Sequence, residues 1–431
     1  MHSILQCINC GRQYSIDAVI YECEACSGLL DVQHDTDWLK ATVSRELFDG
    51  RMGTMQIPYR SGVWRYKELV APYAHDDEIV SRPEGNTNLY DLPRLARWAG
   101  VSRLLLKHEG ENPTGSFKDR GMTGGVTQAK RLGMARVACA STGNTSASLA
   151  SYAAFGGLQG IVLMQNKQIA FGKLSQSIAY GAICIRVDAD FDKNLELVRE
   201  ISAKLGIYVL NSVNPFRLEG QKTIMFETIQ QMRWQTPDWI VVPGGNLGNA
   251  SAFGKGLKEL HTLGLIDRIP SIAIIQAEGA NPLYKAYTRG FDHLEPVSAD
   301  TLATAIKIGN PVNYPKAVRA IQWTEGVVEQ VSDQEIMESK AVVDGIGIGC
   351  EPASAASLAG IRKLVSTGTI QPHETVVGIL TGHVLKDPDA TIDYHADRLE
   401  HVRAVCPNTI RDAEATLESL AQILGEPLSQ S

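Results

Sequence analysis

The sequence predicts an α/β protein with two lobes, in which helices cover both faces of parallel sheets. From about residue 100, short apolar runs alternate with longer amphipathic stretches, the pattern of repeated strand–helix–strand units. The chain has 431 residues, which is more than one hydrophobic core usually supports. A set of 39 glycines also suits a fold with many tight turns between strands and helices.

The predicted strands and helices follow one another regularly. We expect strands at residues 103–107, 136–140, 161–164, 182–187, 207–210, 239–242 and 272–275. We expect helices at residues 116–132, 145–155, 172–180, 191–205, 217–232 and 249–263. Because ligands of such folds bind at the carboxyl ends of strands, functional residues are expected in the loops that follow the strands.

The chain divides into four regions by composition. Residues 1–33 are a small Cys-rich unit, and residues 34–80 are a mixed polar arm that connects it to the core. Residues 81–395 form the core, with a smaller lobe at roughly 120–212 inserted in a larger lobe. Residues 396–431 are predicted to be a helical tail, packed against the rest of the chain over residues 395–425.

Charge and hydropathy exclude several classes of protein. The net charge is −7, the pI is about 5.8 and no basic run is present, which argues against nucleic acid or an anionic membrane as the main partner. No uncharged apolar run approaches the ~18 residues of a membrane-spanning helix. The first residues lack the pattern of a signal peptide, so we expect a cytoplasmic protein.

Four of the eight cysteines form a spaced pattern, Cys7-x2-Cys10-x12-Cys23-x2-Cys26. Paired Cys-x2-Cys turns suit tetrahedral zinc, so these four residues are predicted ligands of a structural zinc ion. The alternative is a ribbon that folds without metal. The other four cysteines are expected to be buried small hydrophobic residues: Cys139, Cys184, Cys350 and Cys406.

The segment Lys107–Gly121 (KHEGENPTGSFKDRG) is the strongest functional motif. It follows a predicted strand, contains an Asn-Pro-Thr-Gly turn, and offers Ser116 as the N-cap of the next helix. Lys118 would then lie at a positive helix end, which lowers the cost of a neutral amine, the form that makes an imine. The alternative is a solvated lysine on the first helical turn.

Three further loops follow predicted strands. Ser141–Ala147 (STGNTSA) leaves backbone amides open to an anion or a hydroxyl, and Val242–Asn249 (VPGGNLGN) suits a phosphate at a helix N-terminus. The second loop matches neither a dinucleotide fingerprint nor a P-loop. Thr381 ends a strand, so its hydroxyl can face a ligand. Each loop alone could also be an ordinary turn or helix cap.

In this order, and together with Gly85–Thr87, these motifs resemble those of the threonine synthases of the tryptophan-synthase-β-like fold. The likeness runs from about residue 60 to 390 and is most specific in the Lys118 segment; Asn211–Arg217 also resembles the family's substrate-phosphate segment. The resemblance implies the two-lobed, three-layer parallel-sheet architecture of fold type II pyridoxal-phosphate enzymes. It also implies a homodimer that converts O-phospho-L-homoserine and water to L-threonine and phosphate.

The resemblance assigns roles residue by residue. Lys118 would form the Schiff base with pyridoxal phosphate and move protons. Asn144 would bond the ring hydroxyl, Thr381 would face the ring nitrogen, and the cofactor phosphate would be held by Gly245, Asn246, Leu247, Gly248 and Asn249. The substrate carboxylate would be held by Ser141 and Thr145, and the substrate phosphate by Asn211, Ser212 and Arg217.

Two positions depart from the family pattern and could shift the substrate pocket: Asn88 replaces a usual Pro, and Val384 a frequent Gly. Cysteate synthase, which uses O-phosphoserine and sulfite on the same scaffold, therefore stays an alternative. Dehydratases and cysteine synthases usually carry Ser opposite the ring nitrogen, so Thr381 speaks against them. A zinc-ribbon binding protein with an inactive enzyme body is the alternative from another class.

Several ionisable residues near the motifs are interpreted as structural or solvated. The four carboxylates are Glu109, Glu111, Asp119 and Glu351, and the histidine in the Thr381 loop is His383.

Overall fold

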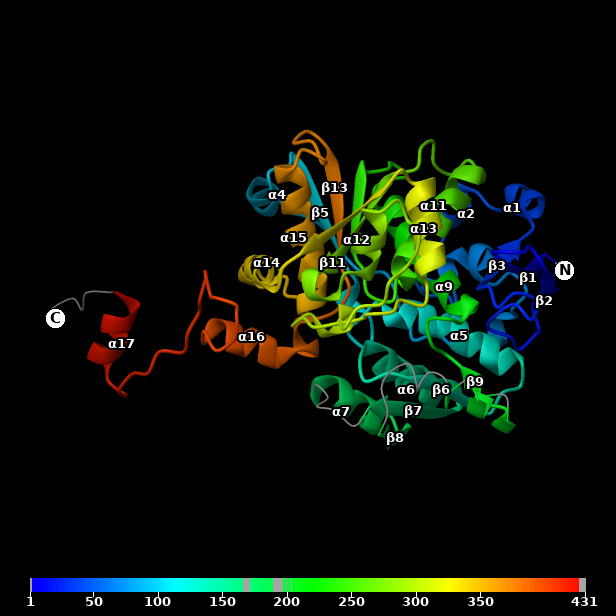
Figure 1. Ribbon diagram of the computed structural model, residues 1–431, viewed down its shortest axis with the longest axis horizontal. Helices are drawn as coiled ribbons and strands as arrows, with labels where there is room; N and C mark the ends of the chain where they lie inside the picture. Colours follow the sequence, from blue (N-terminus) through cyan, green and yellow to red (C-terminus); the bar gives the residue numbers. More distant parts are fainter. Residues whose placement is uncertain (1, 166–170, 189–196, 199, 203, 426–431) are drawn as a thin grey trace.

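The computed structural model describes the whole chain except residues 1, 166–170, 189–196, 199, 203 and 426–431. Figure 1 shows a large body of sheets and helices, a smaller sheet layer beside it, a small unit at the N-terminus and an extended C-terminal end.

The larger lobe is built on a six-stranded sheet in the order β12-β11-β10-β13-β5-β4. Its strands are β12 (Val327–Val331), β11 (Ser271–Ala277), β10 (Trp239–Pro243), β13 (Thr375–Leu380), β5 (Arg103–His108) and β4 (Leu89–Asp91). Each pairs in parallel with its neighbour except β4, which is antiparallel to β5 at the edge.

Helices cover both faces of this sheet because alternate strand residues point to opposite sides. Ile240 and Val242 of β10 enter one core, whereas Trp239 and Val241 enter the other. The first core is closed by α9 (Pro215–Gln221), α10 (Thr223–Gln231), α11 (Gly248–Thr262), α12 (Pro282–Tyr287) and α13 (Tyr314–Trp323). The second is closed by α4 (Pro93–Ala99), α14 (Asp333–Gly345) and α15 (Pro352–Ser366). The larger lobe therefore has three layers.

The smaller lobe is a four-stranded parallel sheet in the order β8-β7-β6-β9. Its strands are β6 (Arg136–Ala140), β7 (Gln159–Gln165), β8 (Ile183–Val187) and β9 (Tyr208–Val209), and its helices include α5 (Lys118–Arg131), α6 (Asn144–Gly156) and α7 (Phe171–Ala179). This sheet lies between β5 and β10 in the chain, which agrees with an inserted lobe. The boundaries of 120–212 stay a prediction.

The N-terminal unit bridges the two lobes. Its three-stranded antiparallel sheet has the order β2-β1-β3, with β1 (Ser3–Cys7), β2 (Gln13–Ser15) and β3 (Leu30–His34). The hydroxyl of Tyr21 accepts a hydrogen bond from the backbone N of Val209 in the smaller lobe (2.7 Å). His34 contacts Glu219 of the larger lobe through Nε2 (3.2 Å), and Asp31 pairs with Lys316 there (2.9 Å).

The remaining elements are short. The connecting arm carries α1 (Thr36–Thr42), α2 (Arg45–Gly50) and α3 (Lys67–Val70). Single 3₁₀ turns occupy Trp64–Tyr66, Asp76–Glu78, Glu109–Glu111, Glu278–Ala280, Thr304–Ile306 and Val384–Lys386.

The predicted strands from 103–107 to 272–275 are confirmed, with ends shifted by one or two residues, and so are most helices. Helix 217–232 begins earlier and is divided at Lys222 into α9 and α10. Most of the helix predicted at 191–205 lies outside the described residues.

The prediction of a packed helix over 395–425 is wrong. The helix α16 (Pro388–His395) ends there, the segment 396–416 is not helical, and only α17 (Leu417–Leu424) follows. Pro407 and the polar residues around it offer neither helical hydrogen bonding nor an apolar face. Figure 1 shows this end of the chain running away from the body.

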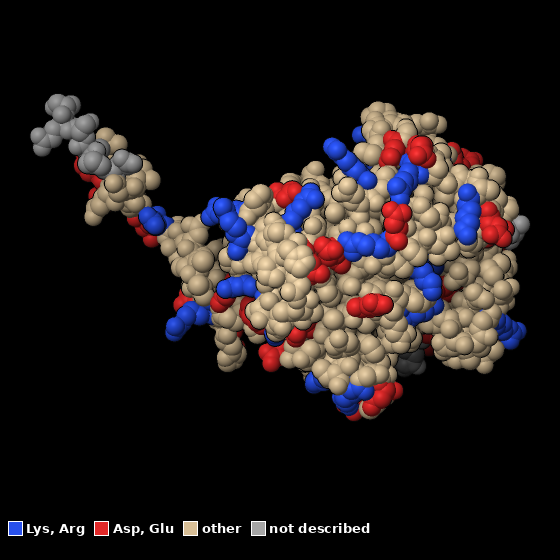
Figure 2. All heavy atoms as spheres, turned by 90° about the horizontal axis from the view of Figure 1, so that it is seen from above, with Lys and Arg blue, Asp and Glu red and all other residues tan. Residues whose placement is uncertain are grey.

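The surface carries mixed charge. On the face drawn in Figure 2, basic and acidic side chains are interspersed rather than gathered into a field of one sign. Within the part of the chain that the structure describes, no helix combines the length and the hydropathy that crossing a membrane requires.

Candidate active site

The loops at the carboxyl ends of strands from both sheets surround a cavity of about 810 Å³. Of the thirteen residues predicted to bind cofactor or substrate, twelve line it: Lys118, Ser141, Asn144, Thr145, Asn211, Ser212, Gly245, Asn246, Leu247, Gly248, Asn249 and Thr381. Arg217 does not. Motifs far apart in the sequence thus meet at the junction of the lobes, where strand-end geometry predicts a ligand site.

Lys118 is the first residue of α5 and lies half-buried at the cavity wall, with Nζ 4.4 Å from the centre of the Phe117 ring. Burial and, after it, the positive charge of Arg217 lower the pKa of Lys118 to about 7, whereas the charge of Glu351 opposes the shift. A lysine with a pKa near 7 has a substantial neutral fraction at pH 7, and the neutral amine is the form that attacks an aldehyde.

The prediction of Ser116 as N-cap is wrong. Phe117 occupies the cap position, and the buried hydroxyl of Ser116 has no hydrogen-bond partner among the described residues. Ser116 instead pairs with Gly382 in an isolated bridge, and the backbone N of Phe117 donates to the carbonyl of Thr381 (3.0 Å). Tertiary pairing between the Lys118 and Thr381 segments therefore overrides local capping.

Asp119 fixes the turn before Lys118. Its carboxylate accepts hydrogen bonds from the backbone N (2.7 Å) and hydroxyl (2.6 Å) of Thr114 and from the hydroxyl of Ser148 (2.6 Å). Burial raises the pKa of Asp119 to about 6, against these hydrogen bonds. Its role is structural, as the sequence suggested.

A buried cluster of ions lies behind Lys118. Arg120 pairs with Glu109 (2.7 Å) and Glu227 (2.9 Å), and Lys107 pairs with Glu227 (2.6 Å). Burial alone would raise the pKa of Glu227, but the charges of Arg120 and Lys107 hold this pKa well below its usual range. Glu227 also accepts from the backbone N of Asn86 (2.8 Å) and Thr87 (3.0 Å), so this unpredicted residue anchors the Gly85–Thr87 motif.

Two helices begin at the cavity and point their N-termini toward it. The helix α6 starts at Asn144, and α11 starts at Gly248 after Leu247, whose φ is +62°. A Cβ at Gly245 would lie 3.1 Å from the carbonyl of Ala305, so glycine keeps this loop close to its neighbours. Backbone amides at a helix start bind anions, which fits the phosphate of the cofactor.

Buried polar atoms at the cavity also fit a polar ligand. The Oδ1 atoms of Asn144 and Asn249 are buried and have no partner among the described residues. The hydroxyl of Thr381 lies 3.0 Å from that of Ser354 and 3.3 Å from Oε1 of Glu351. A neutral hydroxyl, an amide, two helix N-termini and a neutral amine form a donor set suited to pyridoxal phosphate.

The residues predicted for the substrate phosphate are only partly brought together. Asn211 lines the cavity, but its side chain is engaged with the backbone N (3.0 Å) and O (2.9 Å) of Ala140. Arg217 is fully buried off the cavity wall and donates through Nη1 to the carbonyl of Leu210 (3.0 Å). Its Nε and Nη2 have no partner among the described residues, and burial lowers its pKa to about 10.

Sequence reasoning missed one wall of the cavity. The segments 296–299 and 304–310, together with Phe117, Gln221, Leu163 and Met164, also line it. The turn-rich run around Gly309-Asn310-Pro311 was a usable signal, since long polar loops in compact domains are often functional.

The two departures from the family pattern lie outside the cavity lining. Asn88 binds Glu111 through its backbone N (2.7 Å), and Val384 begins a 3₁₀ turn near Gly349. His383 caps that turn by accepting from the backbone N of Leu385 (3.2 Å), a structural role.

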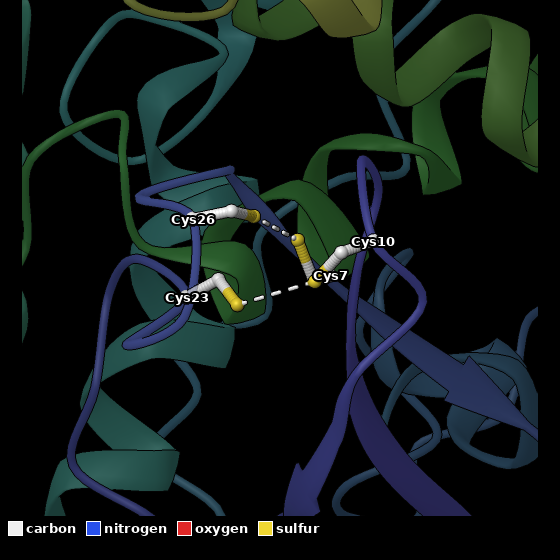
Figure 3. Close-up of side chains that lie close together, drawn as sticks. All are labelled: Cys7, Cys10, Cys23 and Cys26. Carbon is white, nitrogen blue, oxygen red and sulfur yellow. Dashed lines mark hydrogen bonds between the residues drawn. The ribbon is translucent and has the colours of Figure 1, made fainter.

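The four N-terminal cysteines form a cluster, with all Sγ atoms within 4.8 Å of one another. Figure 3 shows them pointing toward one another from two separate stretches of the chain, with Cys7 3.5 Å from Cys26 and Cys10 3.6 Å from Cys23. Tetrahedral zinc with Zn–S bonds of about 2.3 Å would separate sulfurs by about 3.8 Å.

The other cysteines differ in burial. Cys139 and Cys350 are buried as predicted and Cys184 is half-buried, whereas Cys406 is exposed. The prediction is wrong for Cys406, which lies in a stretch of exposed residues at 405–418.

The fold and the cavity define a pyridoxal-phosphate enzyme. A family profile described as "Pyridoxal-phosphate dependent enzyme" matches residues 80–382. Among solved structures, threonine deaminase isoform 2 from Solanum lycopersicum has a TM-score of 0.60 at 22% identity, over 70% of this chain and 84% of that one. Maize serine racemase also has a TM-score of 0.60 at 19% identity, over 75% of this chain and 93% of that one. These likenesses confirm the fold type II architecture.

Two curated relatives are more specific. A threonine synthase of Methanocaldococcus jannaschii is 49% identical over 389 residues, which is 90% of this chain and 94% of that protein. Threonine synthase 2, chloroplastic, of Arabidopsis thaliana is 42% identical over 97% of this chain and 83% of that protein. The chain therefore belongs to the pyridoxal-phosphate dependent enzymes and, within them, to the threonine synthases.

Proposed function

We propose that the chain converts O-phospho-L-homoserine and water to L-threonine and phosphate, with Lys118 holding pyridoxal phosphate covalently. Relatives that are 42–49% identical over most of the chain support this activity. The observation that carries the proposal is the position of Lys118: a half-buried amine with a pKa of about 7 in the same cavity as the N-terminus of α11.

The residues that line the cavity would contact each part of the cofactor. The loop from Gly245 to Asn249 would hold its phosphate, Asn144 would bond the ring hydroxyl and Thr381 would face the ring nitrogen. The bound cofactor supplies an electron sink for carbanion chemistry. The amine of Lys118 would take and return protons at the substrate carbons, which a pKa near 7 suits.

The substrate would be held at both ends. Ser141 and Thr145 lie at the start of α6, where backbone amides and the helix dipole favour a carboxylate. Asn211, Ser212 and Arg217 would hold the substrate phosphate. Arg217 has two buried donors without partners among the described residues, so a movement that brings them to the phosphate would satisfy both.

Closure of the smaller lobe over the cavity would exclude water from the reacting carbon atoms of the substrate. A variant locked open that produced only threonine would contradict this step.

The test measures threonine and phosphate released from O-phospho-L-homoserine by the purified protein with pyridoxal phosphate. Lys118→Ala is the control, and O-phosphoserine with sulfite is supplied in parallel. We expect threonine from the wild type and none from the variant. Cysteate in the parallel reaction, with no threonine, would keep the cofactor assignment and refute the proposed substrate.

We also propose that Cys7, Cys10, Cys23 and Cys26 bind one structural zinc ion. The sulfur separations and the position of this unit across both lobes support the proposal. Metal analysis should find one zinc per chain and none in Cys23→Ser, and that variant should unfold at a lower temperature. Cys406→Ser changes an exposed cysteine outside the cluster and is the matched control.

We further propose a cytoplasmic homodimer that binds neither nucleic acid nor membranes. The acidic net charge of −7 and the mixed surface of Figure 2 support the lack of such partners, and the family resemblance supports the dimer. Light scattering on the eluting protein measures the mass, and a mass of 46.9 kDa, that of one chain, would refute the dimer.

A further inference from the structure

A buried carboxylate without an assigned role lies behind the cavity. Glu351 is 0% exposed and stands immediately before Pro352, the first residue of α15. It contacts two residues that line the cavity, Asn144 and Thr381. Because a buried carboxylate is costly unless donors surround it, these contacts indicate what it does.

The contacts of Glu351 join the two lobes. Its two carboxylate oxygens accept hydrogen bonds from Nδ2 of Asn144 at 3.1 and 3.0 Å, and Oε1 also accepts from the hydroxyl of Thr381 at 3.3 Å. Asn144 opens α6 of the smaller lobe, whereas Glu351 and Thr381 belong to the larger lobe. The Asn144 contact therefore ties the lobes together beside the cavity.

The position of Glu351 is tightly fixed. Its backbone N donates to the carbonyl of Gly382 (3.0 Å), and a Cβ at Gly382 would lie 2.4 Å from Oε1. The hydroxyl of Ser354 accepts from the backbone N of Thr381 (2.8 Å) and of Gly382 (2.9 Å). The N-terminus of α15 also favours a negative charge here. The carboxylate therefore lies directly against the chain that follows β13.

We propose that Glu351 is a positioning residue that orients Asn144 and Thr381 for the cofactor ring and keeps the two lobes in register. Since the carboxylate binds the NH₂ end of the Asn144 amide, it fixes the direction in which the buried, partnerless Oδ1 points. Charge-assisted hydrogen bonds are roughly twice as strong as neutral ones, so a carboxylate holds this amide better than a neutral group would. This inference rests on the proposed binding of pyridoxal phosphate.

The test compares the dissociation constant of pyridoxal phosphate, measured by equilibrium dialysis of the holoenzyme, in the wild type and in Glu351 variants. A lost hydrogen bond to a charged group predicts a rise of about 10-fold for Glu351→Gln and up to about 100-fold for Glu351→Ala. Glu374→Gln changes a half-buried carboxylate at the other end of β13 and should leave the constant unchanged.

A double-mutant cycle separates positioning from a general structural role. If Glu351 acts through Asn144, Glu351→Gln should raise the dissociation constant by less than about threefold in a protein that already carries Asn144→Ala. The inference would be overturned if the fold-changes of the two single variants multiplied in the double variant. It would also be overturned if the dissociation constant of Glu351→Gln lay within twofold of the wild-type value. Glu351→Gln keeps the size of the side chain, so it serves if Glu351→Ala does not fold. A wild type that bound no pyridoxal phosphate would refute the proposed function instead, and this inference with it.

Discussion

The packing of α5 on α9 gives a sharp test of how the site is held. These helices carry Lys118 and Arg217, and they approach each other through glycines. A Cβ at Gly220 would lie 1.8 Å from the carbonyl oxygen of Arg120, whereas real contacts of this kind are not found below 3.0 Å. In Gly220→Ala the helices must therefore part by roughly 1.2 Å, the difference between 3.0 and 1.8 Å.

Both stability and activity should fall in Gly220→Ala. Overpacking of this kind costs about 1–3 kcal/mol of the free energy of unfolding. A displacement of about 1 Å at a catalytic group can cost about 100-fold in rate, so a large loss of kcat/KM for threonine formation is expected. Denaturant unfolding and steady-state kinetics measure the two effects.

The matched control is Gly345→Ala at the end of α14, where an added Cβ meets nothing within 4 Å. There alanine should be neutral or slightly stabilising, by up to about 1 kcal/mol. A Gly220→Ala protein with wild-type stability and rate would refute the argument that this close approach positions Lys118.

Three further perturbations test the electrostatics. Rapid-mixing absorbance measures the rate at which cofactor-free protein takes up pyridoxal phosphate. This rate should rise as the pH passes about 7, because the neutral amine of Lys118 is the reacting form. A midpoint near 10.5, the ordinary pKa of a lysine, would contradict this. Arg217→Met removes a partly unpaired buried charge, so the free energy of unfolding should rise by about 1–2 kcal/mol. Threonine formation should fall in the same variant. A lower free energy of unfolding would contradict the first expectation. Glu227→Gln should lower the free energy of unfolding, measured with denaturant, by about 3–5 kcal/mol, because Lys107 and Arg120 lose their shared anion. The control Glu295→Gln changes an exposed ion pair and should alter this free energy little.

The parts of the fold and site that the sequence predicts depend on local patterns. The alternation of strands and helices is a short-range property, and loops such as Gly245–Asn249 are found by their place between two elements. Because all parallel strands of a sheet end at one edge, the motifs could be expected to meet, and the cavity contains twelve of the thirteen predicted residues.

The features that the sequence did not predict depend on long-range pairing. Glu227 anchors backbone 140 residues away, and Glu351 contacts Asn144 across 207 residues, so no local pattern distinguishes them from solvated carboxylates. Ser116 failed as a cap for the same reason, since its segment pairs with Gly382. The position of Arg217 off the cavity wall follows from the packing of α5 on α9, which is also invisible in the sequence.

The smaller lobe is attached to the rest of the protein by more than its two connecting chains. On the cavity side, Asn144 binds Glu351 of the larger lobe. At the edge strand β9, the backbone of Val209 binds Tyr21 of the N-terminal unit, which is itself fixed to the larger lobe through His34 and Glu219. The helix α5 of the same lobe also packs on α9 and, through Arg120, pairs with Glu109 and Glu227 of the larger lobe. If all these contacts persist, the proposed closure over the cavity would have to come from the loops between them, while Asn144 keeps its place beside the cavity.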